Sequence, residues 1–506
     1  MPIVFSSLID QFYILNFKSR MRFGLLFFAM VLIGFSAQAQ SGYKLNFKIK
    51  GWKDTTVYLG YYFGDITAIK DTARVKSDGS FFFDNKNTLR QGVYFLVLNK
   101  TRIFDFVIGK QQFFNMETDK EDYIAHMKVI GDEDNKLFFE NMAFNMERTK
   151  EVEPFLKVLK DSTIKEDQKK EAREGFNKVN EKVMEHQKKL IEKHPETMTA
   201  RLINATRPIL IPDPPKKANG NIDSTFQLKY YRQHFFDNFN LADDAMIQLP
   251  KPMYQEKVKE YLEKLFVPQS DTITKAFNAL VEKVKRNPET YKYLVMSGMY
   301  FYQQPEIMGL DEVFVNLYDK YFASGEMDYW VPSKTKQSMK EYADKIRTSM
   351  LGRLGTNLIM QDDKLQPRAL YDIKAKYSIV YFFRPSCGHC REETPKLVDF
   401  YNKNKTKYNL EVYAVSSDTS MKEMRDFIKE FKTPWITVNG PRSYLKQHYS
   451  QLYHADTTPT IYILDDKKII VAKKLPVKQL DDFLGKYEKR ERSKKSTSSK
   501  TSGKTP

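Results

Sequence analysis

Cysteine is scarce in this sequence, with two residues in a chain of 506. A small scaffold held together by several disulfides is therefore excluded. The sequence also lacks a Gly-x-x-x-x-Gly-Lys phosphate loop, a dinucleotide-binding glycine fingerprint and a His-Glu-x-x-His metal motif. These absences argue against nucleotide hydrolysis, nicotinamide-dependent redox chemistry and zinc-dependent proteolysis. We expect neither an organic cofactor nor a metal.

The positive charge of the chain is concentrated partly at its ends. Lys and Arg number 82 against 64 Asp and Glu, which gives a formal net charge of +18. The first 22 residues contribute +2 and the stretch from residue 489 contributes +6, so the body carries +10. Because nearly half of the excess lies in these end segments, the charge does not indicate a nucleic-acid-binding surface.

The N-terminal segment has the pattern of a secretory signal peptide. Basic residues around Met21 precede an apolar run of 13 residues, and Ala37-Gln38-Ala39 follows as a small-residue cleavage site. Such a run is shorter than the roughly 20 residues that cross a bilayer. We expect residues 1–39 to be a leader and signal peptide cleaved near Ala39, with Met21 as an alternative start. The mature chain would then be exported, to the periplasm.

Hydrophobic periodicity divides the rest of the chain. Alternating apolar and polar residues from Tyr43 to Lys50 and similar short runs predict a small antiparallel β domain over residues 40–133, with its aromatic residues in the core. Helical spacing predicts an α-helical middle domain over residues 134–350. The Ser, Thr and Lys-rich residues 489–506 predict a disordered basic tail. Contact of this tail with an anionic membrane surface is the alternative.

The two cysteines stand together where a strand pattern changes into a helix pattern. An apolar run from Tyr377 to Phe383 leads into Cys387-Gly388-His389-Cys390. Free N–H groups and the positive dipole end of a helix stabilise a thiolate at its first residue. We therefore expect Cys387 to be the nucleophile and Cys390, one turn further on, to resolve the mixed disulfide.

Two other uses of this cysteine pair have to be considered. A structural zinc site needs about four ligands, whereas the chain has a single Cys-x-x-Cys motif and seven scattered histidines. A structural disulfide across so short a loop would remove little entropy from the unfolded chain. The strand, turn and helix around the pair therefore favour a redox function.

At these residues the sequence resembles the thioredoxin superfamily, and within it the exported thiol-disulfide oxidoreductases of the TlpA and ResA type. The resemblance covers residues 351–488 and includes Pro395, five residues after the second cysteine. It implies a thioredoxin-like α/β domain with a redox-active Cys387–Cys390 disulfide. It also implies that Pro459 is a cis proline and that the backbone of Thr458 pairs with an extended substrate segment. An ordinary trans proline at the start of a strand is the alternative.

The sequence departs from this family at two positions. Members often carry a tryptophan directly before the first cysteine and a buried acid or asparagine six residues before it, where this chain has Ser386 and Tyr381. Glu393 matches the carboxylate that ResA-type proteins place beneath their cysteines. If it is buried there, its pKa should rise and it could take the proton of Cys390. The alternative is an exposed glutamate in the first helical turn.

The multidomain α+β chain is therefore predicted to be an exported thiol-disulfide oxidoreductase. The reductase direction follows from the TlpA and ResA resemblance, with protein disulfides as substrates and a membrane thiol carrier as electron donor. His389 matches the corresponding residue of protein disulfide isomerase and is expected to tune the potential toward oxidation. Two alternatives stay open: a disulfide oxidase or isomerase, and a binding or assembly protein with a redox-sensing module. The sequence leaves the oligomeric state undetermined.

Overall fold

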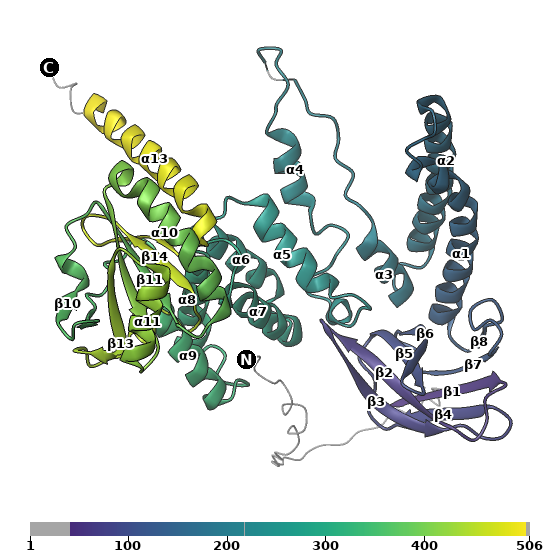
Figure 1. The fold of residues 1–506 in the computed structure, drawn as a ribbon. Coiled ribbons are helices and arrows are strands. Elements are labelled where there is room, and N and C mark those ends of the chain that lie inside the picture. The colour runs from purple at the N-terminus through teal and green to yellow at the C-terminus, as the bar shows by residue number, and fades with distance from the viewer. Residues whose placement is uncertain (1–40, 217, 502–506) are drawn as a thin grey trace, which may run out of the picture. The chain divides into compact units, whose positions relative to one another are not determined.

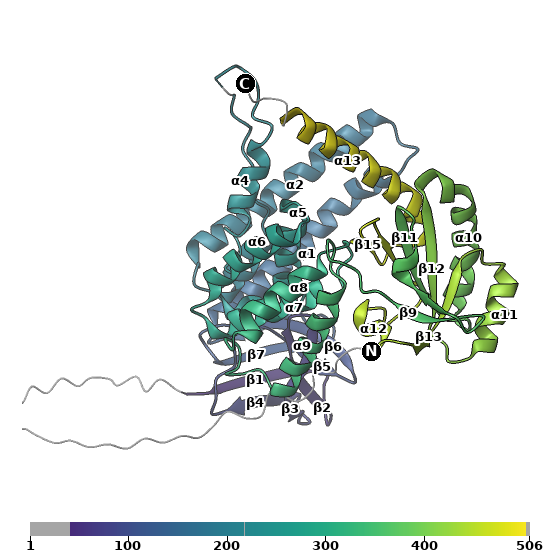
Figure 2. The ribbon, with the colours of Figure 1, turned by 90° about the vertical axis from the view of Figure 1, so that its left-hand side faces the viewer.

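The computed structural model describes residues 41–216 and 218–501. The predicted leader and signal peptide, residues 1–39, lie outside these ranges. Within them, no helix combines the length and the apolar character that a membrane span requires. Figures 1 and 2 show the order of the elements along the chain in two views.

The β domain contains two four-stranded sheets, with strand orders β4-β1-β7-β8 and β3-β2-β5-β6. Their strands are β1 (Tyr43–Lys50), β2 (Thr56–Phe63), β3 (Ile66–Arg74), β4 (Ser80–Asn85), β5 (Gly92–Leu98), β6 (Thr101–Ile108), β7 (Phe113–Asp119) and β8 (Lys128–Ile130). Most neighbours pair antiparallel, as predicted, but β1 and β7 pair in parallel. The predicted antiparallel β domain is confirmed, and β1 and β7 can pair in parallel within it because they are far apart in the chain and no tight turn has to join them.

Aromatic side chains fill the space between these two sheets. Phe47 of β1 is 3 % exposed, whereas Lys44 and Lys48 of the same strand are exposed. Its ring stacks on Phe81 of β4 at 5.1 Å between centroids and meets the edge of Phe106 of β6 at 5.5 Å. Because β1 and β4 belong to one sheet and β6 to the other, these contacts join the sheets face to face. The prediction that the aromatic residues form core is confirmed.

The middle domain is helical, as predicted. Its elements are α1 (Glu133–Lys160), α2 (Glu166–Lys193), α3 (Met198–Thr206), α4 (Phe226–His234), η1 (Asp244–Ile247), α5 (Met253–Leu265), α6 (Ser270–Val284), α7 (Pro288–Gln303), α8 (Asp311–Leu317), η2 (Tyr318–Ala323) and α9 (Ser333–Thr348). Helix α1 begins after Asp132, whose side chain accepts the backbone N–H of Asn135 as an N-cap. Helix α7 begins with Pro288, a residue whose fixed φ suits a first helical turn.

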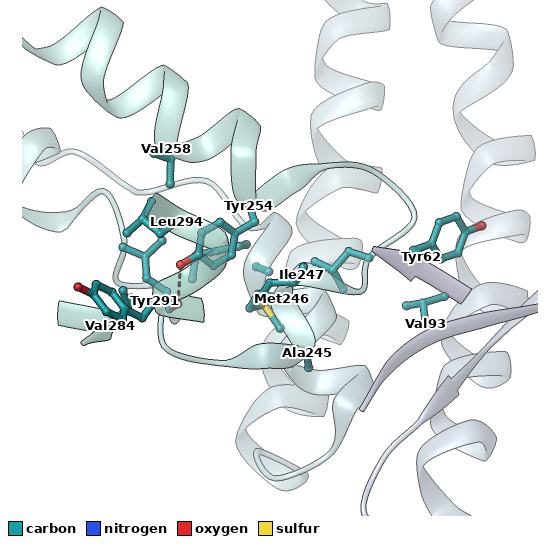
Figure 3. Close-up of a cluster of buried hydrophobic side chains, with 14 of the residues drawn as sticks. Tyr62, Val93, Ala245, Met246, Ile247, Tyr254, Val258, Val284, Tyr291 and Leu294 are labelled. Carbon is teal, nitrogen blue, oxygen red and sulfur yellow. Dashed lines mark hydrogen bonds between the residues drawn. The ribbon is translucent and has the colours of Figure 1, made fainter. Parts of the chain in front are cut away.

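A hydrophobic cluster joins η1 to the helices around it and to the β domain. Figure 3 shows Tyr254, Val258 and Leu294 of α5 and α7 on one side and Met246 and Ile247 of η1 on the other. All of these side chains are buried. The backbone of η1 also bonds to the β domain, since the N–H of Gly64 donates to the carbonyl of Ile247 at 2.8 Å. The β domain and the middle domain therefore share one core.

The C-terminal domain is built on a seven-stranded sheet in the order β10-β9-β13-β12-β11-β14-β15. Its elements are β9 (Ile359–Asp362), β10 (Pro367–Ala369), η3 (Leu370–Asp372), β11 (Tyr377–Phe383), α10 (Gly388–Tyr408), β12 (Leu410–Ser416), α11 (Met421–Phe431), β13 (Ile436–Ser443), α12 (Tyr449–Leu452), β14 (Thr460–Leu464), β15 (Ile470–Lys473), η4 (Val477–Gln479) and α13 (Leu480–Thr501). Strand β11 is parallel to β12 and antiparallel to β14.

Strand β11 is buried along its whole length because both of its faces are covered. Ile379 and Tyr381 point into a cluster with α10, α11 and α13. Val380 and Phe382 point into a second cluster with β9, η3 and α12. The continuous apolar run in the sequence therefore forms an interior strand of a sheet that is covered on both faces.

The prediction that residues 489–506 are disordered is wrong for most of this segment. Helix α13 continues from Leu480 to Thr501, so most of residues 489–506 are helical, and only 502–506 lie outside the described residues. Lys, Arg and Glu are good helix formers, and the segment carries favourable pairs one turn apart. Lys486 pairs with Asp482 at 2.9 Å, and Arg492 pairs with Glu488 at 2.9 Å. These pairs support α13 as far as Arg492.

Candidate active site

The two cysteines lie where the central strand passes into the first long helix of the C-terminal domain. Strand β11 ends at Phe383, and α10 begins at Gly388 with Cys387 as its N-cap residue. Cys387 is partly exposed and Cys390 is buried, and both are free thiols. The helix turn therefore presents one sulfur to solvent and holds the other beneath it.

Cys387 is surrounded by groups that stabilise its thiolate. Burial by itself would raise the pKa of its thiol, but hydrogen bonds from Cys390 and from the backbone N–H groups of Cys390 and His389 outweigh burial and hold the pKa below its ordinary value. These N–H groups are the unpaired donors of the α10 N-terminus. In the thiol form, Cys387 Sγ donates to the carbonyl oxygen of Thr458 at 3.5 Å. Cys387 is therefore the thiol that ionises first.

Cys390 has the opposite character. Burial raises the pKa of its thiol to about 11, although the backbone N–H of Arg384 contacts its sulfur at 3.5 Å and acts in the other direction. The neighbouring Cys387 sulfur raises the pKa of Cys390 further. A thiol with this pKa is protonated near neutral pH. It becomes a nucleophile only when a proton acceptor is available or when Cys387 has been consumed in a disulfide.

Hydroxyl groups occupy the space beneath Cys390. The Tyr381 hydroxyl lies 2.9 Å from Thr394 Oγ1, and Thr394 Oγ1 donates to the Cys390 carbonyl oxygen at 2.7 Å. Both side chains are buried, and burial raises the pKa of Tyr381 well above its ordinary value. Tyr381 is therefore a neutral hydrogen-bonding group at the position where related domains often carry an acid. It fixes the first turn of α10 and cannot serve as a base at neutral pH.

Glu393 is partly exposed and forms an ion pair with Lys396. Its side chain is 25 % exposed, and its Oε1 accepts a hydrogen bond from Lys396 Nζ at 2.6 Å. Of the two readings of the sequence, the structure therefore matches the partly exposed glutamate of a first helical turn. The His389 side chain is 85 % exposed, with Nδ1 3.7 Å from Glu392 Oε2. His389 acts on Cys387 through its backbone N–H, and its imidazole faces solvent.

The sheet brings the Thr458–Pro459 segment to the cysteines. Strand β14 begins at Thr460, which lies opposite Phe382 at the end of β11. The turn before β14 therefore sits beside the turn after β11, although the two are more than 70 residues apart in sequence. The Thr458–Pro459 peptide bond is cis. The Thr458 carbonyl is the backbone group that meets Cys387.

The described residues contain no cluster of three or more His, Cys, Asp or Glu side chains that could hold a metal ion. A surface hollow lined by Asp372, Lys405 and Glu411 lies at the start of β12. Cys387 follows the opposite, carboxyl end of the parallel β11, so this hollow is separate from the cysteines.

The sequence pattern locates both cysteines, and the family resemblance draws attention to Tyr381 and Thr458. The structure brings these residues together. The sequence pattern does not reveal Thr394, although this residue stands four positions after Cys390 and therefore on the same helical face. His454, on the turn that leads to Thr458, was also not predicted. Its burial depends on contacts with the middle domain, and no local pattern could indicate them.

Three segments of the chain match known domain families. Residues 351–473 match the AhpC/TSA family, residues 168–345 match a domain of unknown function (DUF5106), and residues 43–138 match another (DUF4369). These segments correspond to the C-terminal, middle and β domains of the structure.

Curated proteins are similar to part of the chain. Probable nucleoredoxin 1 of Arabidopsis thaliana is 30 % identical over 87 residues, which are 17 % of this chain and 15 % of that protein. Tryparedoxin of Trypanosoma brucei brucei is 23 % identical over 128 residues, which are 25 % of this chain and 85 % of that protein. The chain spans 15 % to 27 % of the length of the nucleoredoxins that it matches.

A solved structure described as a domain of a possible thiol-disulfide isomerase from Cytophaga hutchinsonii is 39 % identical. It covers 28 % of this chain and 97 % of its own, with a TM-score of 0.27. The matched residues 351–473 include the seven-stranded sheet and both cysteines. The predicted thioredoxin-like oxidoreductase domain is confirmed: residues 351–473 form a thioredoxin-like domain of the AhpC/TSA family.

Proposed function

We propose that the protein is a thiol-disulfide oxidoreductase that reduces disulfides in exported protein substrates. The observation that carries this proposal is the unequal acidity of the two thiols. Cys387 has a lowered pKa at the start of α10, and Cys390 has a pKa raised to about 11 one turn below it. One thiolate ready to attack and one protected thiol held in reserve are what disulfide exchange requires.

The reaction proceeds through two exchanges. The Cys387 thiolate attacks one sulfur of a substrate disulfide, forms a mixed disulfide and releases the other substrate sulfur as a thiolate, which takes up a proton. Cys390 then loses its proton and attacks Cys387 Sγ, which releases the second substrate thiol. The substrate disulfide gains two electrons and two protons in total, and the Cys387–Cys390 pair becomes a disulfide.

The Thr458 turn supplies the surface on which the substrate is oriented. Its carbonyl lies 3.5 Å from the attacking sulfur, so a disulfide bound at Cys387 lies next to this backbone. An extended substrate segment that pairs with the Thr458 backbone would bring its sulfur in line with Cys387. Pro459 would shape this turn.

The reductase direction requires a source of electrons. After each turnover the Cys387–Cys390 disulfide must be reduced again, and we assign this step to a thiol carrier in the membrane. Support for this direction comes from the TlpA and ResA resemblance. The signal-peptide pattern that ends at Ala39 supports export to the periplasm, where protein disulfides form.

Two measurements on the full chain test this proposal. Reduced protein should reduce the disulfides of a polypeptide such as insulin, and the Cys387→Ser variant should not. The reduction potential of the cysteine pair should lie closer to about −270 mV, as in thioredoxin, than to about −120 mV, as in a strong oxidant. A potential near −120 mV would support the oxidase alternative. Absence of exchange with any polypeptide disulfide would support the binding alternative.

A further inference from the structure

The turn that carries Thr458 is held from outside its own domain. It consists of residues 453–459, which connect α12 to β14. Within it, Tyr453, His454 and Ala455 are buried, and Thr458 contacts Cys387. Three residues of helix α9, which belongs to the middle domain, contact this turn or the helix before it.

The first of these contacts is aromatic. The Tyr342 ring of α9 meets the edge of the His454 ring, with 5.0 Å between centroids and an interplanar angle of 89°. Burial, and then the cation of Lys474, lower the pKa of His454 to about 4, so this imidazole is neutral near pH 7. Tyr342 is itself fixed, because its hydroxyl donates to the carbonyl of Gln303 at 2.7 Å. The contact is therefore packing between two anchored rings.

Two polar contacts lie on either side of this ring pair. Lys345 Nζ of α9 lies 3.1 Å from Asp456 Oδ2, two residues before Thr458. Thr348 Oγ1 at the end of α9 donates to the carbonyl of Gln451 in α12 at 2.9 Å. Helix α9 therefore contacts the segment at residues 451, 454 and 456.

A second connection fixes the strand next to the turn. Lys473 of β15 lies opposite Tyr462 of β14, and its Nζ is 2.6 Å from Asp311 Oδ2 in α8. The two side chains are 3 % and 8 % exposed. Lys473 Nζ also donates to the carbonyl of Ser349 at 3.1 Å. Separation of the two side chains would leave a buried charge without its partner, which would strongly destabilise the folded protein. This ion pair therefore fixes the position of the middle domain on this edge of the sheet.

We propose that helix α9 positions the substrate-binding turn, with Tyr342 and Lys345 as its positioning residues. This inference rests on the proposed function. The middle domain holds residues 454–456 so that the Thr458 backbone stays beside Cys387 and is ready to receive an extended polypeptide. Small thiol reagents need only Cys387, whereas a polypeptide disulfide needs the turn as well. Removal of the α9 contacts should therefore weaken polypeptide binding and leave the intrinsic reactivity of Cys387 unchanged.

The test compares Tyr342→Ala/Lys345→Ala with the wild type in the full chain. The KM for reduction of insulin should rise about tenfold, which equals about 1.4 kcal/mol of lost binding free energy. The kcat and the rate of Cys387 alkylation by iodoacetamide should stay within about twofold of the wild-type values. Amide hydrogen exchange of residues 454–461 should become faster. Lys422→Ala, which removes an exposed pair with Asp426 at 2.6 Å in α11, is the matched control and should change none of these quantities.

Milder variants keep the test decisive if the double variant folds poorly. Lys345→Ala alone should raise KM about threefold, and Lys345→Arg, which keeps the ion pair, should restore the wild-type value. An unchanged KM in Tyr342→Ala/Lys345→Ala would overturn the proposal. A parallel fall of kcat, alkylation rate and insulin binding would also overturn it, because it would indicate general damage. If the wild type reduced no disulfide at all, the proposed function would fail, and the hydrogen-exchange result alone would decide whether α9 holds the turn.

Discussion

The β domain and the C-terminal domain both bury aromatic residues on strands, but they use them differently. In the β domain, Phe47 stacks on Phe81 and meets Phe106, and these rings have no polar atoms. In the C-terminal domain, Tyr381 stacks on Phe383 at 5.5 Å while its hydroxyl bonds to Thr394 beneath Cys390. Aromatic density therefore marks a core in both domains. Chemistry arises only where a buried strand ends at a helix N-terminus that carries a thiol.

Cys387→Ser should abolish the activity of the C-terminal domain. Serine has no thiolate, so disulfide reduction should fall to the uncatalysed background. Insulin reduction with the purified variant measures this loss, and an unchanged thermal midpoint would show that the fold is intact. Activity that persists in Cys387→Ser would contradict the assignment of the nucleophile.

Phe47→Ala should produce its effect on stability rather than on chemistry. Truncation of a buried phenylalanine costs about 3–5 kcal/mol. Denaturant unfolding can be followed by tryptophan fluorescence, because Trp52 stacks on Phe81 at 5.9 Å. The alkylation rate of Cys387 in the folded variant should equal that of the wild type. A loss of less than about 1 kcal/mol would contradict the core position of Phe47, and a changed alkylation rate would show that the β domain influences the cysteine site.

The pH dependence of alkylation should reveal the difference between the two thiols. Only the thiolate reacts, and a lowered pKa means that the thiolate of Cys387 is present at lower pH than that of an ordinary cysteine. The rate should therefore rise with pH and reach half of its maximum below about 8.5, the usual thiol value. Cys390, with a pKa of about 11, should add little below pH 9. A half-maximal rate above pH 9 would contradict the described environment of Cys387.

Glu393→Gln should have the smallest effect. The carboxylate points to Lys396 and is partly exposed, so disulfide reduction should change by less than about twofold and unfolding by less than about 0.5 kcal/mol. Lys396→Ala serves as the control, because it removes the partner and keeps the carboxylate. A tenfold loss of activity in Glu393→Gln alone would restore Glu393 as a proton-transfer group for Cys390.

Local pattern was sufficient to predict the features that depend on neighbouring residues. Such features depend on residues only a few positions apart in the chain. They are the alternation from Tyr43 to Lys50, the apolar run of β11 and the helix start at Cys387. The position of Pro459 beside the cysteines came from the family resemblance. The contacts of Tyr342 with His454 and of Asp311 with Lys473 could not be predicted, because each joins residues more than 100 positions apart that carry no shared motif. The helical tail was not predicted, because a Ser, Thr and Lys-rich composition without apolar periodicity is typical of disorder.

The Cys390→Ser variant tests the central claim most directly. With the resolving thiol removed, the Cys387 thiolate can attack a substrate disulfide but the mixed disulfide cannot be released by Cys390. Isolation of this variant from intact cells, with free thiols blocked at lysis, should recover covalent complexes with exported proteins. Dithiothreitol should release these complexes, and the Cys387→Ser/Cys390→Ser double variant should form none. If Cys390→Ser yields no complexes, the chain does not act as a thiol-disulfide oxidoreductase on protein substrates.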